Sequence, residues 1–368
     1  MIPVNRPVIT NIDAKNVYKV VKNGWISSSG PQIKIFEKKF KKFIGKNYGS
    51  AVTSGTAALE IALKCINIKK NDEVIIPNFT IISNALAVIK QNALPIPIDC
   101  DLKTWNMDIN LLKKSITKKT KAVIATHIYG YPLEIDKIKK ICKKNKIYLI
   151  EDAAEMIGNK FKGKYCGHYG DISVFSFYAN KHITTGEGGM LLTNNKNFYK
   201  KIESLKNLCF GKDNRYNHDD IGWNYRFTNL QAAMGISQLK RINLIIKKKR
   251  EIGKLYFRKI SKNKNLYIQS PKYKNLNNIY WVVGILIKNK KMTANKLRKK
   301  LKKYGIDSRS FFWPMNQQTI LKKMKYKFKG TFKNSEFLSK YGLYLPSGLG
   351  TTKKEINFVA EILNKILK

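Results

Sequence analysis

Residues 176–189 read SFYANKHITTGEGG and place a single lysine, Lys181, between an apolar run and a glycine-rich turn. About one residue in six of the chain is lysine, yet from Ile172 to Leu192 only Lys181 and Glu187 are charged. The ammonium form of a lysine is disfavoured where nothing solvates it, and the uncharged amine is a usable nucleophile. Taken alone, the same position also fits a surface lysine in a hairpin loop.

Apolar runs of strand length alternate with amphipathic runs of helical spacing up to about residue 240. The strand-length runs are DEVIIPN, LPIPID, KAVIATHIYG, KIYLIED, DISVFSFYA and GGMLLTN. Such alternation predicts an α/β fold with a mostly parallel sheet covered by helices. We therefore expect a large domain with an N-terminal arm over residues 1–240.

A long helical pattern without a breaker runs over residues 237–260 and can carry the chain into a second domain. Beyond it, IYWVVGILI and YGLYLPS are strand candidates, and ANKLRKKLKKYG is a helix candidate that Gly305 ends. These elements predict a smaller α+β domain over residues 241–368.

Composition limits the class of protein. No stretch approaches the roughly 18 uncharged apolar residues that a membrane span needs, and the first ten residues lack the apolar region of a signal peptide. We expect no membrane insertion and a cytoplasmic location. The five cysteines are odd in number and widely spaced, and the four histidines are scattered, which indicates reduced thiols and no metal site.

The net charge of +47 ordinarily points to nucleic acid or to an anionic surface. However, eight of the 71 basic residues are arginines, and the 63 lysines are spread through almost every helical segment. Reading of DNA bases favours arginine, and binding of single-stranded nucleic acid needs aromatic residues placed between basic ones. The sequence shows neither pattern. We expect no specific nucleic-acid partner. A basic nucleic-acid- or surface-binding protein on an inactive enzyme scaffold is the alternative from another class.

Two further motifs complement Lys181. Asp152 directly follows an apolar strand, and open parallel sheets bind ligands at the carboxyl ends of their strands. A carboxylate there can hold a heterocyclic nitrogen, or it can cap a following helix. Residues 54–56, SGT, open a helix whose N–H groups favour phosphate. An amine, an acid for a ring nitrogen and a phosphate site are together what pyridoxal 5'-phosphate requires.

With these motifs the chain resembles the sugar aminotransferases of the DegT/DnrJ/EryC1/StrS family. The stretches that carry the resemblance span nearly the whole chain: IPVNRP, GWISSSG, TSGTAAL, PNFT, DLKTWNMD, IYGYP, IEDAAE, FSFYANKHITTGEGGM, GWNYRFTNLQAAMG and SRSFFWPM. The resemblance implies the aspartate aminotransferase-like fold, fold type I of the pyridoxal-phosphate enzymes. Relatives that dehydrate at C3 replace the lysine with histidine, so Lys181 implies transamination.

The resemblance also implies roles for the site residues. Lys181 would bind the cofactor covalently and carry protons during the reaction, and Asp152 would bind the pyridine nitrogen. Glu155 would face the phenolic oxygen of the cofactor, and Phe79 would lie against its ring. The implied phosphate ligands are Gly55, Thr56, Ser176 and, from the partner subunit of a homodimer with active sites at its interface, Asn224.

Within the family the perosamine-forming branch is the most similar. It implies amination of C4 of GDP-4-keto-6-deoxymannose to give GDP-perosamine, with L-glutamate as amino donor and pyridoxamine phosphate as the intermediate form of the cofactor. A UDP- or dTDP-linked 4-keto-6-deoxyglucose, or an N-acetylated sugar, is the alternative substrate. Arg309 is the candidate for the pyrophosphate. Phe312 and Trp313 are candidates for packing on the base or sugar, unless they belong to the core of the small domain.

Overall fold

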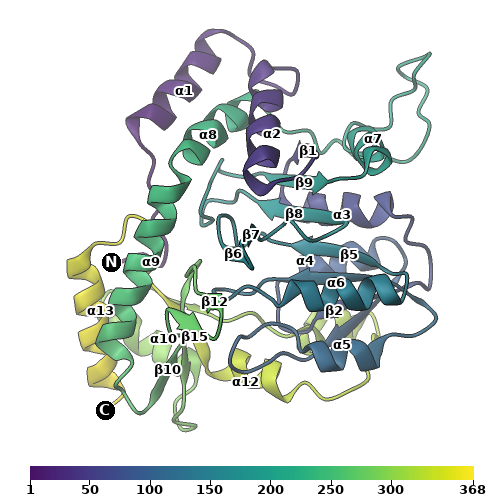
Figure 1. Ribbon diagram of the computed structural model, residues 1–368. Coiled ribbons are helices and arrows are strands. Elements are labelled where there is room, and N and C mark those ends of the chain that lie inside the picture. Colours follow the sequence, from purple (N-terminus) through teal and green to yellow (C-terminus); the bar gives the residue numbers. More distant parts are fainter.

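The protein, described here over all of residues 1–368 by a computed structural model, contains one seven-stranded and one four-stranded sheet (Figure 1). The larger sheet has the order β1-β9-β8-β5-β4-β2-β3. Its strands are β1 (Tyr48–Val52), β2 (Glu73–Pro77), β3 (Leu94–Ile98), β4 (Thr120–Thr126), β5 (Tyr148–Asp152), β8 (Ile172–Ser176) and β9 (Gly189–Thr193). Only β9 runs antiparallel to its neighbours, β8 and β1. The α/β fold with a mostly parallel sheet is confirmed.

Helices cover both faces of this sheet (Figure 1). They are α2 (Pro31–Ile44), α3 (Gly55–Cys65), α4 (Ser83–Ile89), α5 (Ile109–Ser115), α6 (Ile135–Lys144) and α7 (Lys196–Leu205). Along β2, Val74 and Ile76 pack with α3 and α4, whereas Ile75 packs with α5 and α6. Because side chains alternate between two buried faces, each strand is a continuous apolar run in the sequence.

The four-stranded sheet is antiparallel, in the order β10-β13-β15-β14. Its strands are β10 (Leu266–Ile268), β13 (Val283–Ile287), β14 (Arg309–Ser310) and β15 (Gly342–Leu345). The helices of this part are α9 (Ile242–Ile260), α10 (Ala294–Lys303), α11 (Thr319–Lys323), α12 (Lys333–Tyr341) and α13 (Lys353–Ile366), with a 3-10 helix at Met315–Gln317. Two short hairpins, β6 (Lys160–Phe161) with β7 (Lys164–Tyr165) and β11 (Lys272–Tyr273) with β12 (Leu276–Asn277), complete the strands.

The helical pattern over residues 237–260 is not one helix. It is divided at Arg241 between α8 (Asn229–Lys240) and α9. The Arg241 guanidinium pairs with the fully buried Asp13 of α1 (Asn11–Lys22), which packs beside α8. This tertiary ion pair carries no signal in the sequence pattern, so the uninterrupted helix that we predicted is wrong at this residue.

Chain segments cross between the two sheets. Ile2 pairs with Ile306 next to the small sheet, and Met315 and Leu321 pack in the core of the large one. The domain boundary at residues 240 and 241 therefore stays a prediction. None of the helices is both long and apolar enough to cross a membrane.

Candidate functional site

A cavity of about 350 Å³ lies where the ends of three parallel strands meet the small sheet. Thr126 ends β4, Asp152 ends β5 and Ser176 ends β8. The lining residues are Ser54, Gly55, Thr56, Leu59, Ile81, Ser83, Thr126, Asp152, Ala154, Glu155, Ser176, Tyr178, Asn180, Lys181, Glu187, Trp281, Arg309, Phe312 and Tyr344. Seven of the site residues predicted from the sequence converge here, together with Arg309 and Phe312.

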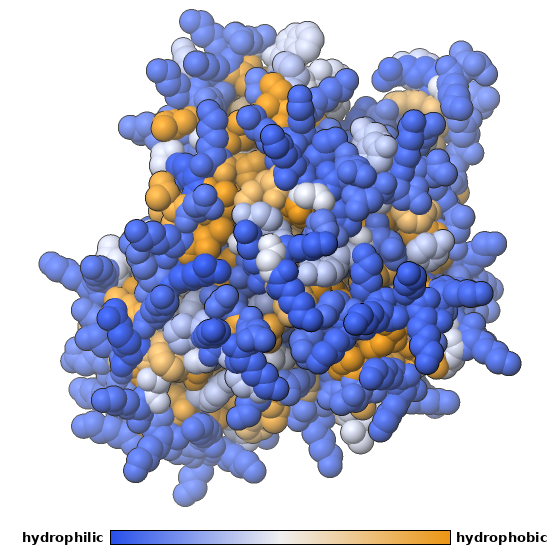
Figure 2. All heavy atoms as spheres, in the orientation of Figure 1, coloured by the Kyte–Doolittle hydropathy of each residue, from blue (hydrophilic) through white to orange (hydrophobic).

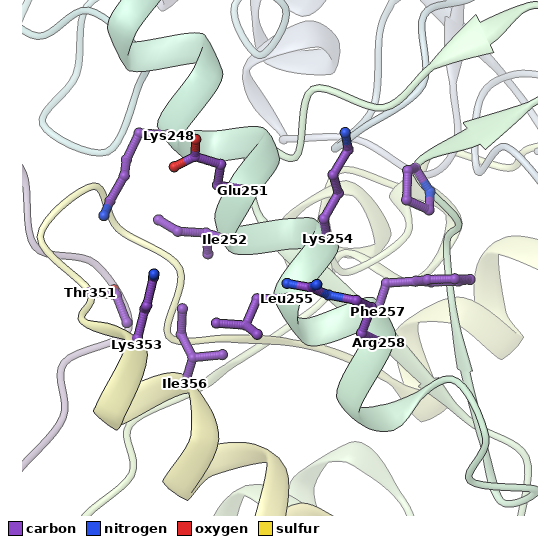
Figure 3. Close-up of a pocket in the computed structure, with 11 residues that line it drawn as sticks. Lys248, Glu251, Ile252, Lys254, Leu255, Phe257, Arg258, Thr351, Lys353 and Ile356 are labelled. Carbon is purple, nitrogen blue, oxygen red and sulfur yellow. The ribbon is translucent and has the colours of Figure 1, made fainter.

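A larger cavity, of about 590 Å³, lies between α9 and α13 on the outer side of the small sheet. Figure 3 shows that lysine side chains and one carboxylate, Glu251, surround an apolar floor there. None of the predicted site residues borders it, so its size does not make it the candidate active site.

Lys181 lies in the turn after β8 with only 10% of its side chain exposed. Its Nζ is 3.8 Å from Oε1 of Glu155 and 3.8 Å from the centroid of the Trp281 ring. Burial lowers the pKa of Lys181, while the charges of Glu155 and Asp152 act in the opposite direction. The scarcity of charge in the sequence thus corresponds to a buried amine and not to a surface loop.

Asp152 presents a buried carboxyl group to the cavity. Its Oδ1 accepts a hydrogen bond from the Ala154 N–H (3.1 Å) and its Oδ2 accepts one from the Thr126 hydroxyl (3.2 Å). Asn84 in turn donates to Thr126 Oγ1 (2.6 Å). Burial raises the pKa of Asp152, and the Ala154 N–H, Lys181 and Thr126 oppose that rise. No helix follows Asp152, so the alternative role as a helix cap is excluded.

Glu155 is the second buried carboxyl group of the cavity. Its Oε2 accepts a hydrogen bond from the Tyr129 N–H (2.8 Å), and its Oε1 faces Lys181. Burial raises the pKa of Glu155 to about 8, although the nearby Lys181 charge lowers it. Tyr129 has a left-handed backbone, with φ of 59°, and this conformation directs its N–H to the carboxyl group. A neutral Glu155 can therefore donate a proton at neutral pH.

The N-terminus of α3 forms the opposite wall. Ser54 caps the helix by accepting from the Ala57 N–H (3.1 Å), and Thr56 hydrogen-bonds to Ser83 (2.8 Å). A Cβ atom on Gly55 would lie 3.0 Å from the Cβ of Ser176, so a larger residue here would require the strand or the helix to shift. The N–H groups of a first helical turn, its positive dipole and hydroxyl groups together form an anion site.

The other predicted residues are placed differently. Arg309 and Phe312 line the cavity, and Arg309 hydrogen-bonds to Tyr344. Phe79 is fully buried against Tyr129, with ring centroids 5.7 Å apart, and does not reach the cavity wall. Trp313 is 54% exposed and donates its indole N–H to the Gln317 carbonyl, away from the cavity. Phe79 therefore packs in the hydrophobic core, whereas Trp313 lies neither in the core nor in the cavity wall, and their contacts with cofactor and substrate stay predictions.

Asn224 is exposed and lies outside the cavity of its own chain. Its side-chain oxygen accepts a hydrogen bond from Arg226 Nε (2.8 Å). Within one chain Asn224 does not reach the phosphate site, so its role as a phosphate ligand for a second subunit stays a prediction.

Several cavity residues were not predicted from the sequence. They are Leu59, Ile81, Ser83, Thr126, Ala154, Tyr178, Asn180, Glu187, Trp281 and Tyr344. Thr126 could have been found, because it ends a strand run next to the one that Asp152 ends. Trp281 and Tyr344 come from the small sheet, and no local pattern shows their approach to Lys181.

Comparisons with known proteins show the family and the fold of the chain. The DegT/DnrJ/EryC1/StrS aminotransferase family matches residues 7–364. GDP-perosamine synthase from Escherichia coli O157:H7 is 37% identical over 365 residues, covering 99% of this chain and 98% of the relative. The Vibrio cholerae enzyme of the same name is 36% identical, covering 100% and 98%. The solved structure of E. coli GDP-4-keto-6-deoxy-D-mannose-3-dehydratase with bound hydrated PLP is 25% identical, has a TM-score of 0.89 and covers 100% and 99%.

The raised pKa of Glu155 predicts a pH-dependent effect of Glu155→Gln on stability. An unperturbed glutamate has a pKa of 4.5, whereas the pKa of Glu155 in the folded protein is about 8. Between these two pH values Glu155 is protonated in the folded state and ionised in the unfolded state. The contribution of Glu155 to the free energy of unfolding therefore falls as the pH rises. The free energy of unfolding of Glu155→Gln relative to the parent should therefore increase by at least about 1 kcal/mol from acidic to alkaline pH.

Urea unfolding of the cofactor-free protein at several pH values measures this difference. The same comparison in a Lys181→Ala background removes the coupled lysine from the titration. A difference that stays constant across the pH range in both backgrounds would contradict a raised pKa of Glu155.

Proposed function

The chain belongs to the DegT/DnrJ/EryC1/StrS aminotransferase family, and from this premise we propose that it aminates C4 of GDP-4-keto-6-deoxymannose to give GDP-perosamine. L-Glutamate is the proposed amino donor. The observation that carries the proposal is the buried amine of Lys181, which faces two buried carboxyl groups in a cavity closed by a helix N-terminus. The names of the relatives support the GDP-linked sugar.

The residues of the cavity fit pyridoxal 5'-phosphate. The N-terminus of α3, with Gly55, Thr56 and Ser176, would hold the phosphate, and Asp152 would bind the pyridine nitrogen. When bound, the cofactor supplies an electron sink for the negative charge that develops beside the substrate nitrogen. Because Thr126 and the Ala154 N–H fix both oxygens of Asp152, this carboxyl group needs no rearrangement to meet the ring nitrogen.

Lys181 moves the protons of the proposed reaction. Burial lowers the pKa of Lys181 and so favours the uncharged amine, in which Nζ can accept a proton from the α-carbon of glutamate and later return one to C4 of the sugar. Glu155, 3.8 Å away, provides a second proton reservoir beside the same nitrogen. Donor and acceptor use the one cavity in turn, which gives ping-pong kinetics.

The outer part of the cavity would bind the nucleotide sugar. Arg309 is exposed at this edge and would pair with the pyrophosphate by bidentate hydrogen bonds. Phe312 and Tyr344 offer flat surfaces for the sugar or base beside it. The alternative substrate for this part of the cavity is a UDP- or dTDP-linked 4-keto-6-deoxyglucose or an N-acetylated sugar.

A homodimer is part of the proposal. The segment between α7 and α8 projects from the molecule (Figure 1). The exposed Asn224 lies near the base of this segment, where it pairs with Asn207. Large apolar side chains are also exposed on α1 and just beyond it: Ile12, Tyr18, Val21, Trp25 and Ile26. An exposed apolar patch of this kind favours burial against another chain, and a phosphate ligand from the partner subunit would complete the anion site at α3.

A cytoplasmic location is also proposed, because all five cysteines are buried and unbonded, as suits a reducing compartment. The rival class of a nucleic-acid-binding protein rests on the net charge of +47 alone. Hydrophilic side chains cover the visible face without gathering into one stripe (Figure 2).

The proposal predicts a defined substrate preference. With pyridoxal phosphate, L-glutamate should change the absorbance spectrum of the purified protein, and GDP-4-keto-6-deoxymannose should restore the first spectrum faster than the UDP- or dTDP-linked keto sugars. Lys181→Ala should show neither change, because no other amine reaches the cavity, whereas the exposed Lys196→Ala should behave as the parent. Faster restoration by a UDP or dTDP sugar would overturn the substrate, and no response to glutamate would overturn the reaction.

The shared active site predicts complementation between two inactive variants. Lys181→Ala and Asn224→Ala each lose activity alone, but a mixed dimer contains one site in which Lys181 and Asn224 are both intact. Random reassociation of equal amounts should therefore restore about a quarter of the parent activity per site. Activity that stays at the level of the separate variants, under conditions where tagged subunits are shown to exchange, would count against a site shared between subunits.

A further inference from the structure

We infer that Lys249 is a positioning residue of the active site, which holds the Trp281 ring against the amine of Lys181. The inference rests on the proposed function of Lys181 for its effect on catalysis. Its geometry does not depend on that function, since every contact described below lies within this one chain.

Trp281 is fixed relative to Lys181 by two contacts. Its ring lies 3.8 Å from Lys181 Nζ, and its indole N–H donates to the carbonyl of Asn180, the residue before Lys181 (3.0 Å). The side chain is only 5% exposed. The ring therefore excludes water from one side of the amine and restricts where Nζ can point.

Lys249, on α9, is buried without a carboxylate partner. It is 4% exposed, and its Nζ donates to the carbonyl oxygens of Trp281 (2.8 Å) and Ser347 (2.6 Å). Burial lowers the pKa of Lys249 to about 7. Burying an amine in this way is unfavourable compared with an apolar residue of the same size. The two hydrogen bonds link the backbone at the ends of the adjacent strands β13 and β15. This link explains why a lysine occupies a buried position on α9.

The same face of α9 also accommodates the residue before Trp281. Gly253 lies one turn after Lys249, and a Cβ atom there would be 2.2 Å from the ring of Tyr280. Tyr280 has a left-handed backbone, with φ of 53°, and its N–H donates to Asn278 Oδ1 (2.8 Å). Residues four apart on a helix share one face. Thus α9 provides space for the Tyr280 ring and a hydrogen bond for the Trp281 carbonyl.

This arrangement gives Lys249 an effect on the chemistry through Trp281. Without the hydrogen bond from Lys249, the Trp281 carbonyl loses its partner and the ring can move away from Lys181. The amine then becomes accessible to water and less restricted in direction, which impairs proton transfer more than substrate binding. Lys249 does not border the cavity, and Trp281 is the cavity residue to which it donates a hydrogen bond, so we assign its influence to this contact.

A double-mutant cycle tests this dependence. Lys249→Met removes the donor at similar volume, Trp281→Leu removes the ring, and the third variant combines both. We expect Lys249→Met to lower kcat about tenfold with little change in KM for L-glutamate, but to lower it less than about twofold in the Trp281→Leu background. Lys249→Gln, which keeps a donor, should recover most of the rate. The matched control is Lys248→Met, an exposed neighbour on α9 that borders the separate cavity of Figure 3.

A second readout needs no cofactor and no activity. Reductive methylation of the cofactor-free protein, with each lysine followed by mass spectrometry, reports how accessible Lys181 is. Labelling of Lys181 should be several times faster in Lys249→Met and in Trp281→Leu, while other lysines keep the parent rate. If Lys249→Met does not fold, Lys249→Leu, which also removes the donor, replaces it in this test.

The two readouts separate the possible failures. If the parent does not transaminate but Lys181 labelling accelerates as expected, the proposed function fails and the positioning role stands. If the parent is active, the inference is overturned by equal losses of kcat from Lys249→Met in both Trp281 backgrounds, or by unchanged Lys181 labelling in the variants.

Discussion

The exclusion of water from the amine of Lys181 is the interaction on which the rest of the site depends. A buried ammonium group is unfavourable by several kcal/mol unless it is compensated. Here compensation comes from the Glu155 carboxyl group 3.8 Å away, from the charge of Asp152 and from the face of one aromatic ring. The amine therefore exchanges protons easily, in a protein whose other lysines lie mostly in water. The low charge of residues 172–192 is the sequence counterpart of that burial.

Three carboxyl groups that are close in the sequence have different tasks, and strand alternation along β5 separates two of them, Glu151 and Asp152. Asp152 faces the cavity, whereas Glu151 points to the other side of β5, where His127 Nε2 lies 3.1 Å from it and the N–H groups of Gly167 and Gly170 donate to it. Burial alone would raise the pKa of Glu151, but these hydrogen bonds hold it below its usual range. Glu155, with a single backbone donor, has a raised pKa instead. The number of donors thus distinguishes a structural carboxylate from a protonated carboxyl group beside the amine.

Much of this organisation could be predicted from the sequence because it is local. Six apolar runs correspond to strands, and Lys181, Asp152 and the SGT turn each lie at the end of a strand or the start of a helix. Contacts made by residues distant in the chain could not be predicted. The hydrogen bond from Thr126 to Asp152, the approach of Trp281 and the division of the helix at Arg241 all depend on tertiary packing. The sequence also does not show whether an aromatic residue in a family motif, such as Phe79, lies in the cavity wall or in the hydrophobic core, because that depends on tertiary packing.

The central claim is that Lys181 is chemically distinct among the 63 lysines because it is buried beside Glu155 and Trp281 and also borders the cavity. The most direct measurement is to treat the protein with pyridoxal phosphate, reduce it with borohydride and identify the modified lysines by mass spectrometry. The account predicts one stoichiometric modification, at Lys181, with only traces on surface lysines. Modification spread over many lysines, or concentrated at another position, would contradict it.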